Sequence, residues 1–181
     1  TVSVLNVLAW LLSAAVVEQR RAALGAEAHA MRRLQILLSA GYVFGCAWRC
    51  LLPVYDVPRL VLVDSFWSSV IVGRTVATLA ELCFAAQWAL LLREAAQATA
   101  SRVAHAVSRA VLPMIVVAET CSWHAVLTTA NLGHVVEETL WGLCAALLAI
   151  SLLAIWPRVA PSARKMPISD RRSETAMAKV L

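Results

Sequence analysis

The segment "GHVVEETLWG" at residues 133–142 places a histidine and two adjacent glutamates at the start of a long apolar run. On an α-helix with ~100° between successive residues, His134, Glu137 and Glu138 occupy one arc of about 100°. Imidazole nitrogens and carboxylate oxygens serve as metal ligands and general bases. Because ionisable groups cost at least ~2.5 kcal/mol each inside a membrane, they usually face the interior of a helix bundle. We therefore expect these side chains to form part of an inward-facing chemical site.

A second polar stripe precedes this segment and centres on His124, with two threonines and Asn131 on the same expected helix face. The connection to the last apolar run is very short, so the two helices are expected to be antiparallel neighbours. His124 would then approach His134 in the outer half of the bundle. The sequence predicts one divalent metal ion there, with an open position for water or substrate. Its candidate ligands are His124, His134, Glu137 and Glu138.

A third group of polar side chains centres on Arg74. Arg74 and Glu119 lie at nearly the same depth near the centres of their runs, counting ~1.5 Å of rise per residue. We expect an ion pair between them, which either clamps two helices or takes part in the chemistry. Glu81 lies about two turns from Arg74 on the same face and is expected to share the guanidinium, through Thr78 or water, or to stay neutral. The candidate catalytic residues are Glu138, Glu137, Glu119 and Arg74.

The second apolar run contributes Arg49 and a pair of glycines. Arg49 is expected to pair with Asp64 or with a glutamate of the last run, and the alternative is an anion or lipid head group. Gly41 and Gly45 have the GxxxG spacing that lets another helix approach closely, so they are candidate contacts with a second copy or a membrane complex. The candidate residues for pairing with a substrate or an ion are Arg49, Asp64, Glu81 and Asn131.

Five apolar runs must position these side chains. The chain is 61% hydrophobic, whereas the apolar share of a globular domain is roughly half. Each run approaches the ~20 residues that a membrane-spanning helix requires. The sequence therefore predicts an all-α, polytopic transmembrane bundle over residues 1–157 and a flexible, basic cytoplasmic tail over 158–181. The expected spans are 1–17, which is the weakest, 34–53, 60–92, 111–130 and 134–156.

The charges between the runs predict an orientation and the surroundings of the chain. Lys and Arg gather in the first and third connections and in the tail, whereas 54–59 and 129–134 hold one arginine between them. By the positive-inside rule, the C-terminus is expected in the cytoplasm and the N-terminus outside. The net charge of +5 is thus mainly a topology signal. No basic stripe interleaved with aromatic residues lies outside the runs, so the expected partner is the lipid bilayer and not a nucleic acid.

Three functions fit this arrangement. The first is a metal-dependent membrane enzyme that acts on a lipid or other hydrophobic substrate. The second is a proton- or cation-conducting channel or transporter, and the third is an accessory subunit of a larger membrane complex. The sequence contains no nucleophile elbow, haem-ligand pattern or nucleotide-binding loop, so the type of reaction stays open. The acidic ladder of the second function comprises Asp64, Glu137, Glu138, His124, Arg74, Glu119 and Glu81.

Overall fold

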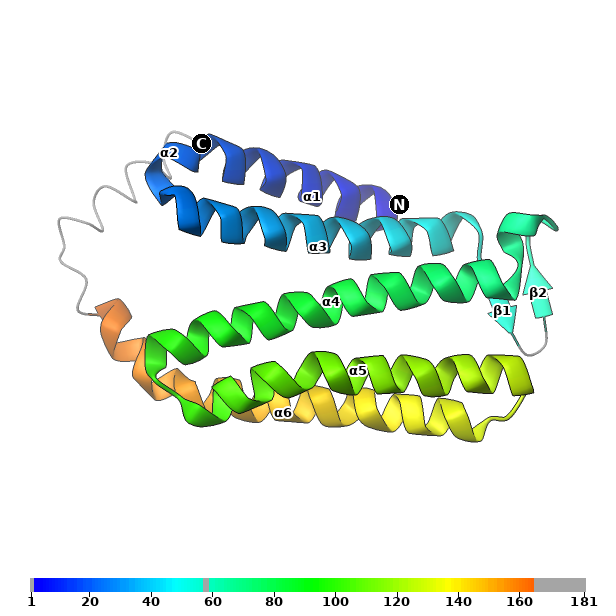
Figure 1. The fold of residues 1–181 in the computed structure, drawn as a ribbon. Coiled ribbons are helices and arrows are strands. Elements are labelled where there is room, and N and C mark those ends of the chain that lie inside the picture. Colours follow the sequence, from blue (N-terminus) through cyan, green and yellow to red (C-terminus); the bar gives the residue numbers. More distant parts are fainter. Residues whose placement is uncertain (1, 57–58, 165–181) are drawn as a thin grey trace.

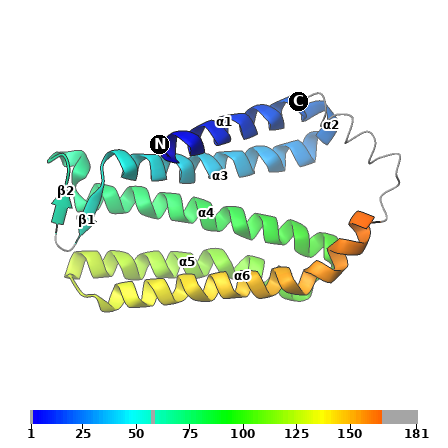
Figure 2. The same ribbon diagram turned by 180° about the vertical axis from the view of Figure 1, so that it is seen from behind.

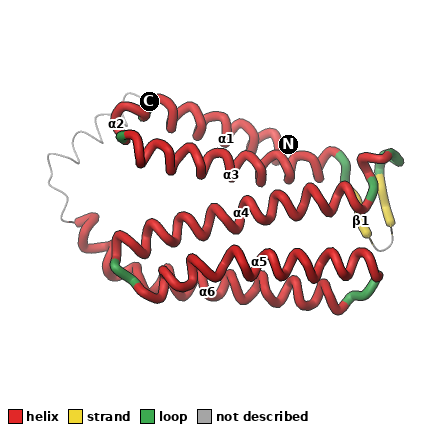
Figure 3. Tube along the Cα trace, viewed as in Figure 1, coloured by secondary structure: helices red, strands yellow, loops and turns green. Residues whose placement is uncertain are grey.

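The computed structural model of the protein describes residues 2–56 and 59–164, and nearly all of this chain is helical (Figure 3). Five helices are long and apolar enough to cross a membrane, as the expected all-α bundle requires. These five helices fit a multi-pass membrane protein. They are α1 (Val2–Gln19), α3 (Ala26–Leu51), α4 (Val70–Thr99), α5 (Arg102–Thr128) and α6 (Leu132–Arg164).

Three short elements complete the described chain. Helix α2 (Arg21–Leu24) joins α1 to α3, and a 3₁₀ turn, η1 (Phe66–Ser68), precedes α4. Strands β1 (Val54–Asp56) and β2 (Arg59–Val61) form a two-stranded antiparallel hairpin in which Val54 pairs with Val61. We call the end of the bundle that carries these strands the hairpin end; α5 ends and α6 begins there as well (Figure 1).

The long helices lie side by side in chain order, as the two opposite views show (Figures 1 and 2). Helix α3 packs against α1 on one side and α4 on the other, and α4 packs against α5. Helix α6 packs along α5 and also touches α4. The buried apolar core lies among α4, α5 and α6 and includes Leu92, Val111 and Ile115. Helix α1 has no buried residue, which leaves its apolar side chains free to face lipid.

The third apolar run differs from the expected span over 60–92. Helix α4 begins at Val70, because the segment before it folds into the hairpin and η1. Pro53 limits helix formation at the start of this segment, and the valines and tyrosine after it favour a strand. The Ser69 side chain then caps α4 by accepting a hydrogen bond from the Val72 N–H at 3.4 Å. Asp64 and Trp67 consequently lie in the connection and not within a span.

The other connections follow the sequence more closely. The Ala-rich third connection extends both neighbouring helices, so only residues 100 and 101 separate α4 from α5. Ala100 adopts a left-handed conformation with φ of 50°, and Ser101 caps α5. Helix α6 continues through Pro157 to Arg164, beyond the expected end of the bundle. The rest of the expected flexible tail, 165–181, lies outside the described residues.

Glycines allow close approach at two of the helix contacts. A Cβ atom on Gly45 would lie 2.6 Å from the Ala80 Cβ, and one on Gly41 would lie 2.5 Å from the Cys83 Sγ. The GxxxG pair therefore packs α3 against α4 within one chain. At the start of α6, a Cβ on Gly133 would collide with the backbone oxygen of Cys121 on α5. Gly133 thus sets how closely α6 begins against α5.

We expect Gly133→Ala to destabilise the bundle by ~1–3 kcal/mol, because the added methyl group meets a backbone atom that cannot turn away. Gly142→Ala is the matched control in the same helix, since nothing lies within 4 Å of the position of its Cβ. Thermal unfolding in detergent, followed by circular dichroism, measures both. Equal midpoints for the two variants would contradict the close approach of α5 and α6.

Candidate functional site

Arg74 on α4 is the centre of the site. Its Nη2 atom lies 2.8 Å from Glu119 Oε2 on α5 and 2.7 Å from Glu137 Oε1 on α6. Glu81, two turns further along α4, has Oε2 3.9 Å from the same nitrogen. The ion pair between Arg74 and Glu119 that their depths predict is therefore present, and the contact with Glu137 is additional to it. One guanidinium joins three helices.

A chain of hydrogen bonds holds the carboxylate of Glu119. The Thr78 hydroxyl donates to Glu119 Oε2 at 2.7 Å, and the Trp123 indole N–H donates to the Thr78 hydroxyl at 3.0 Å. Trp123 lies one turn from Glu119 on α5, so the indole reaches back over the same face of the helix. Sequence reasoning did not include Trp123 in the site. The sequence feature that could have pointed to Trp123 is its position. Trp123 lies deeper in its apolar run than the other tryptophans, which fall toward the ends of their spans.

A histidine orients the carboxylate of Glu137. His134 Nδ1 lies 3.0 Å from Glu137 Oε2, one turn earlier on α6. The side chain of Glu137 is 8% exposed and that of His134 is 39% exposed, so the carboxylate is buried behind a partly accessible imidazole. Arg74 contacts one oxygen of Glu137 and His134 contacts the other. Both partners fix the direction in which the remaining lone pairs point.

The three carboxylates are close enough to share one ion. One oxygen from each of Glu81, Glu119 and Glu137 lies within 4.8 Å of the other two. Glu119 Oε1 is buried and makes no hydrogen bond within the described part of the chain, although the Glu119 side chain is only 4% exposed. A buried carboxylate oxygen without a partner is costly. This oxygen is therefore a candidate position for a ligand atom of the site.

The structure brings some of the sequence-predicted metal ligands to this cluster and leaves others apart. His134 reaches it through Glu137, and Glu138 lines a cavity beside it. His124 and Asn131 are exposed, and neither belongs to the group of three carboxylates. Glu119 is buried, and His124 lies ~140° round the helix from it, so the inward turn of Glu119 leaves His124 exposed.

The residues expected to pair with a substrate or an ion likewise lie in different parts of the structure. Glu81 belongs to the cluster, whereas Asp64 lies in the connection before η1. Arg49 is exposed on α3 and lines the cavity beside the cluster. Within the described residues, Arg49 forms no ion pair with Asp64 or with a glutamate of α6. Its guanidinium is thus available to the cavity.

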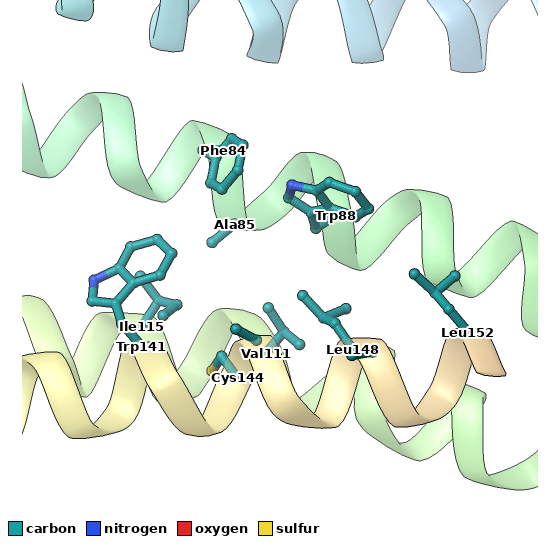
Figure 4. A pocket seen from close by; sticks show the side chains of 11 residues that line it. Phe84, Ala85, Trp88, Val111, Ile115, Trp141, Cys144, Leu148 and Leu152 are labelled. Atoms are coloured by element: carbon teal, nitrogen blue, oxygen red, sulfur yellow. The ribbon is translucent and has the colours of Figure 1, made fainter. Parts of the chain in front are cut away.

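One cavity adjoins the cluster, and a second cavity shares lining residues with the first. The polar cavity, of about 430 Å³, is open and lies among α3, α4 and α6; its charged lining residues are Arg49, Glu81, Glu137 and Glu138. The apolar cavity, of about 340 Å³, lies among α4, α5 and α6, with Trp88 and Trp141 in its lining (Figure 4). Phe84 and Trp141 line both cavities. Glu81 and Glu137 of the cluster therefore line the open polar cavity, which meets the apolar cavity at the two shared aromatic side chains.

Comparison of the chain with protein-family models, curated proteins and solved structures finds no match.

We expect Arg74→Met to destabilise the protein by ~3–5 kcal/mol, because it leaves the buried carboxylates of Glu119 and Glu137 without their cation. Adding Glu119→Gln and Glu137→Gln to this variant should restore part of the loss. Arg49→Met is the control, since Arg49 is exposed and outside the ion-pair network. Folded yield and thermal midpoint in detergent measure the effect. A wild-type midpoint for Arg74→Met would rule out a structural role for this guanidinium.

Trp123→Phe should cost ~0.5–1.5 kcal/mol through the lost hydrogen bond to Thr78. Trp156→Phe is the matched control, because Trp156 is 71% exposed. Chemical unfolding of both variants in detergent gives the comparison. If the two substitutions have equal effects, the indole does not support the cluster.

Proposed function

We propose that this protein is a membrane-embedded, metal-dependent enzyme that acts on a lipid or other hydrophobic substrate. Its metal ligands are Glu81, Glu119 and Glu137. The observation that carries the proposal is the convergence of these carboxylates, from three helices, to within 4.8 Å of one another. This set keeps Glu137 from the ligands that the sequence alone suggests and adds Glu81 and Glu119, whereas His124 is exposed and outside the cluster.

Charge balance supports a divalent ion. Carboxylates that ligate a metal ion are ionised, and three of them around one guanidinium leave a formal charge of −2. An unbalanced charge in a hydrocarbon environment is costly. A single divalent ion would cancel it. Carboxylate oxygens suit hard ions such as Mg²⁺ and Mn²⁺ better than ions that prefer nitrogen or sulfur ligands. His134 then acts through Glu137, whose carboxylate it orients.

The polar cavity supplies the position for the reaction. A bound divalent ion polarises a substrate oxygen or makes a bound water more acidic. Glu138 lines this cavity but is not one of the three ligands, so it is the candidate general base. Arg49 lines the same cavity and is the candidate contact for the polar part of the substrate.

The core of the bundle favours this enzyme over a conducting pathway. Beyond the cluster, away from the hairpin end, the buried residues among α4, α5 and α6 are mainly aliphatic. Among Asp, Glu, His, Lys and Arg, the side chains that are buried within the described residues are His29, Glu119 and Glu137. A proton or cation pathway through the bundle would need further ionisable side chains along this core. The acidic ladder ends at Glu81.

We expect the protein, purified without chelator and dialysed against Mn²⁺, to bind about one ion per chain, as three converging ligands would hold. The double variant Glu119→Gln, Glu137→Gln should lose this binding, because each substitution removes a charged ligand while keeping the shape of the side chain. His124→Ala is the control and should bind as the wild type does. Elemental mass spectrometry gives the stoichiometry.

Two results would overturn the metal site. Folded wild-type protein that binds no divalent ion would remove it and favour the conducting alternative, which a flux assay in liposomes measures directly. Loss of binding in His124→Ala, with retention in the double glutamine variant, would return the site to His124, His134 and Glu138 among the ligands suggested by the sequence alone.

A further inference from the structure

The polar cavity and the apolar cavity meet at a shared pair of aromatic side chains, and we call the two cavities together the groove. Phe84 and Trp141 line both, and their ring centroids lie 6.4 Å apart. On one side of this aromatic pair lie the charged residues of the polar cavity. On the other side, Trp88 from α4 faces Leu148 from α6 across a space without polar side chains other than the indoles and one thiol (Figure 4). A ligand that fits the groove must be amphipathic.

The apolar cavity has the length of one lipid leaflet. Its lining follows α6 from Trp141 to Leu152, which spans ~16 Å at ~1.5 Å of rise per residue. The hydrocarbon core of a bilayer is ~30 Å thick, so this is about half of it. A volume of about 340 Å³ is at the small end of ligand cavities. The length and the narrowness together suit a single hydrocarbon chain that lies along the helices.

The charges of the polar cavity limit which chemical group this ligand can carry as its polar head. The cluster is balanced once a divalent ion is bound, and beyond it the cavity holds one guanidinium, on Arg49, and one further carboxylate, on Glu138. These two charges also balance. A phosphate or ammonium head would enter without a counter-charge, which is costly in a bilayer. A hydroxyl group can accept a hydrogen bond from Arg49 and donate one to Glu138.

We propose that the substrate is a single-chain lipid with a small hydroxyl head, bound with its chain in the apolar cavity and its head between Arg49 and Glu138. This substrate class rests on the proposed function, because the charge balance of the polar cavity includes the bound ion. The groove gives the substrate a fixed orientation, since only the head can reach the carboxylate cluster.

The test uses the quenching of tryptophan fluorescence by a long-chain alcohol that carries bromine near its methyl end. Trp88 and Trp141 line the apolar cavity, so a bound chain should quench them in a saturable manner. Ala145→Phe fills this cavity and should weaken saturable quenching at least tenfold. Ala146 is exposed, as Ala145 is, but lies outside the lining, so Ala146→Phe should leave quenching unchanged. The brominated amine and phosphate with the same chain should bind at least tenfold more weakly than the alcohol.

The control for the metal site is Mn²⁺ binding by the same samples, which Ala145→Phe should retain. Normal Mn²⁺ binding with quenching that is equal in the two phenylalanine variants would indicate lipid contact with the outer surface only, and would overturn the substrate class while leaving the metal site in place. Tighter binding of the amine or the phosphate would overturn the hydroxyl head. Absence of Mn²⁺ binding in every sample would instead overturn the proposed function, and the substrate class with it.

Discussion

The constraint on which the structure depends is that a charge buried in hydrocarbon must meet its counter-charge inside the protein. Arg74 meets this requirement with carboxylates from two other helices, at 2.8 Å and 2.7 Å. Each contact fixes both the rotation and the register of a helix. A single guanidinium therefore ties α4, α5 and α6 to one another, and Trp123, through Thr78, and His134 hold the carboxylates in place.

The small residues have a complementary role. Gly45 lets α3 approach α4 closely, and Gly133 does the same for α6 and α5. Helix α3 is thereby attached to α4, and an open space remains between α3 and α6. Glu81 and Glu137 of the carboxylate cluster line this space. The apolar core lies further from the hairpin end than the cluster does. Packing of small residues and pairing of charges thus create the groove together.

The sequence predicts the spans and the central ion pair well, because hydropathy and depth along a helix are one-dimensional properties. It does not predict the hairpin before α4, since apolar strand residues and apolar helix residues have the same hydropathy. The sequence also does not decide which of the two polar faces of α5 is buried. Spacing shows that His124 and Glu119 point in different directions, but only the packing of three helices decides that Glu119 is the buried one. The pairing of Arg74 with Glu137 depends on the same packing.

The polar cavity is bounded by three helices and is open. If the proposed lipid substrate enters this opening from the bilayer, it reaches the opening by diffusing within the membrane plane and does not cross the aqueous phase. The concentration that governs occupancy is then the mole fraction of the ligand among the surrounding lipids. Adding detergent or inert lipid dilutes the ligand at a fixed total amount, so an apparent affinity has meaning only together with the composition of the membrane.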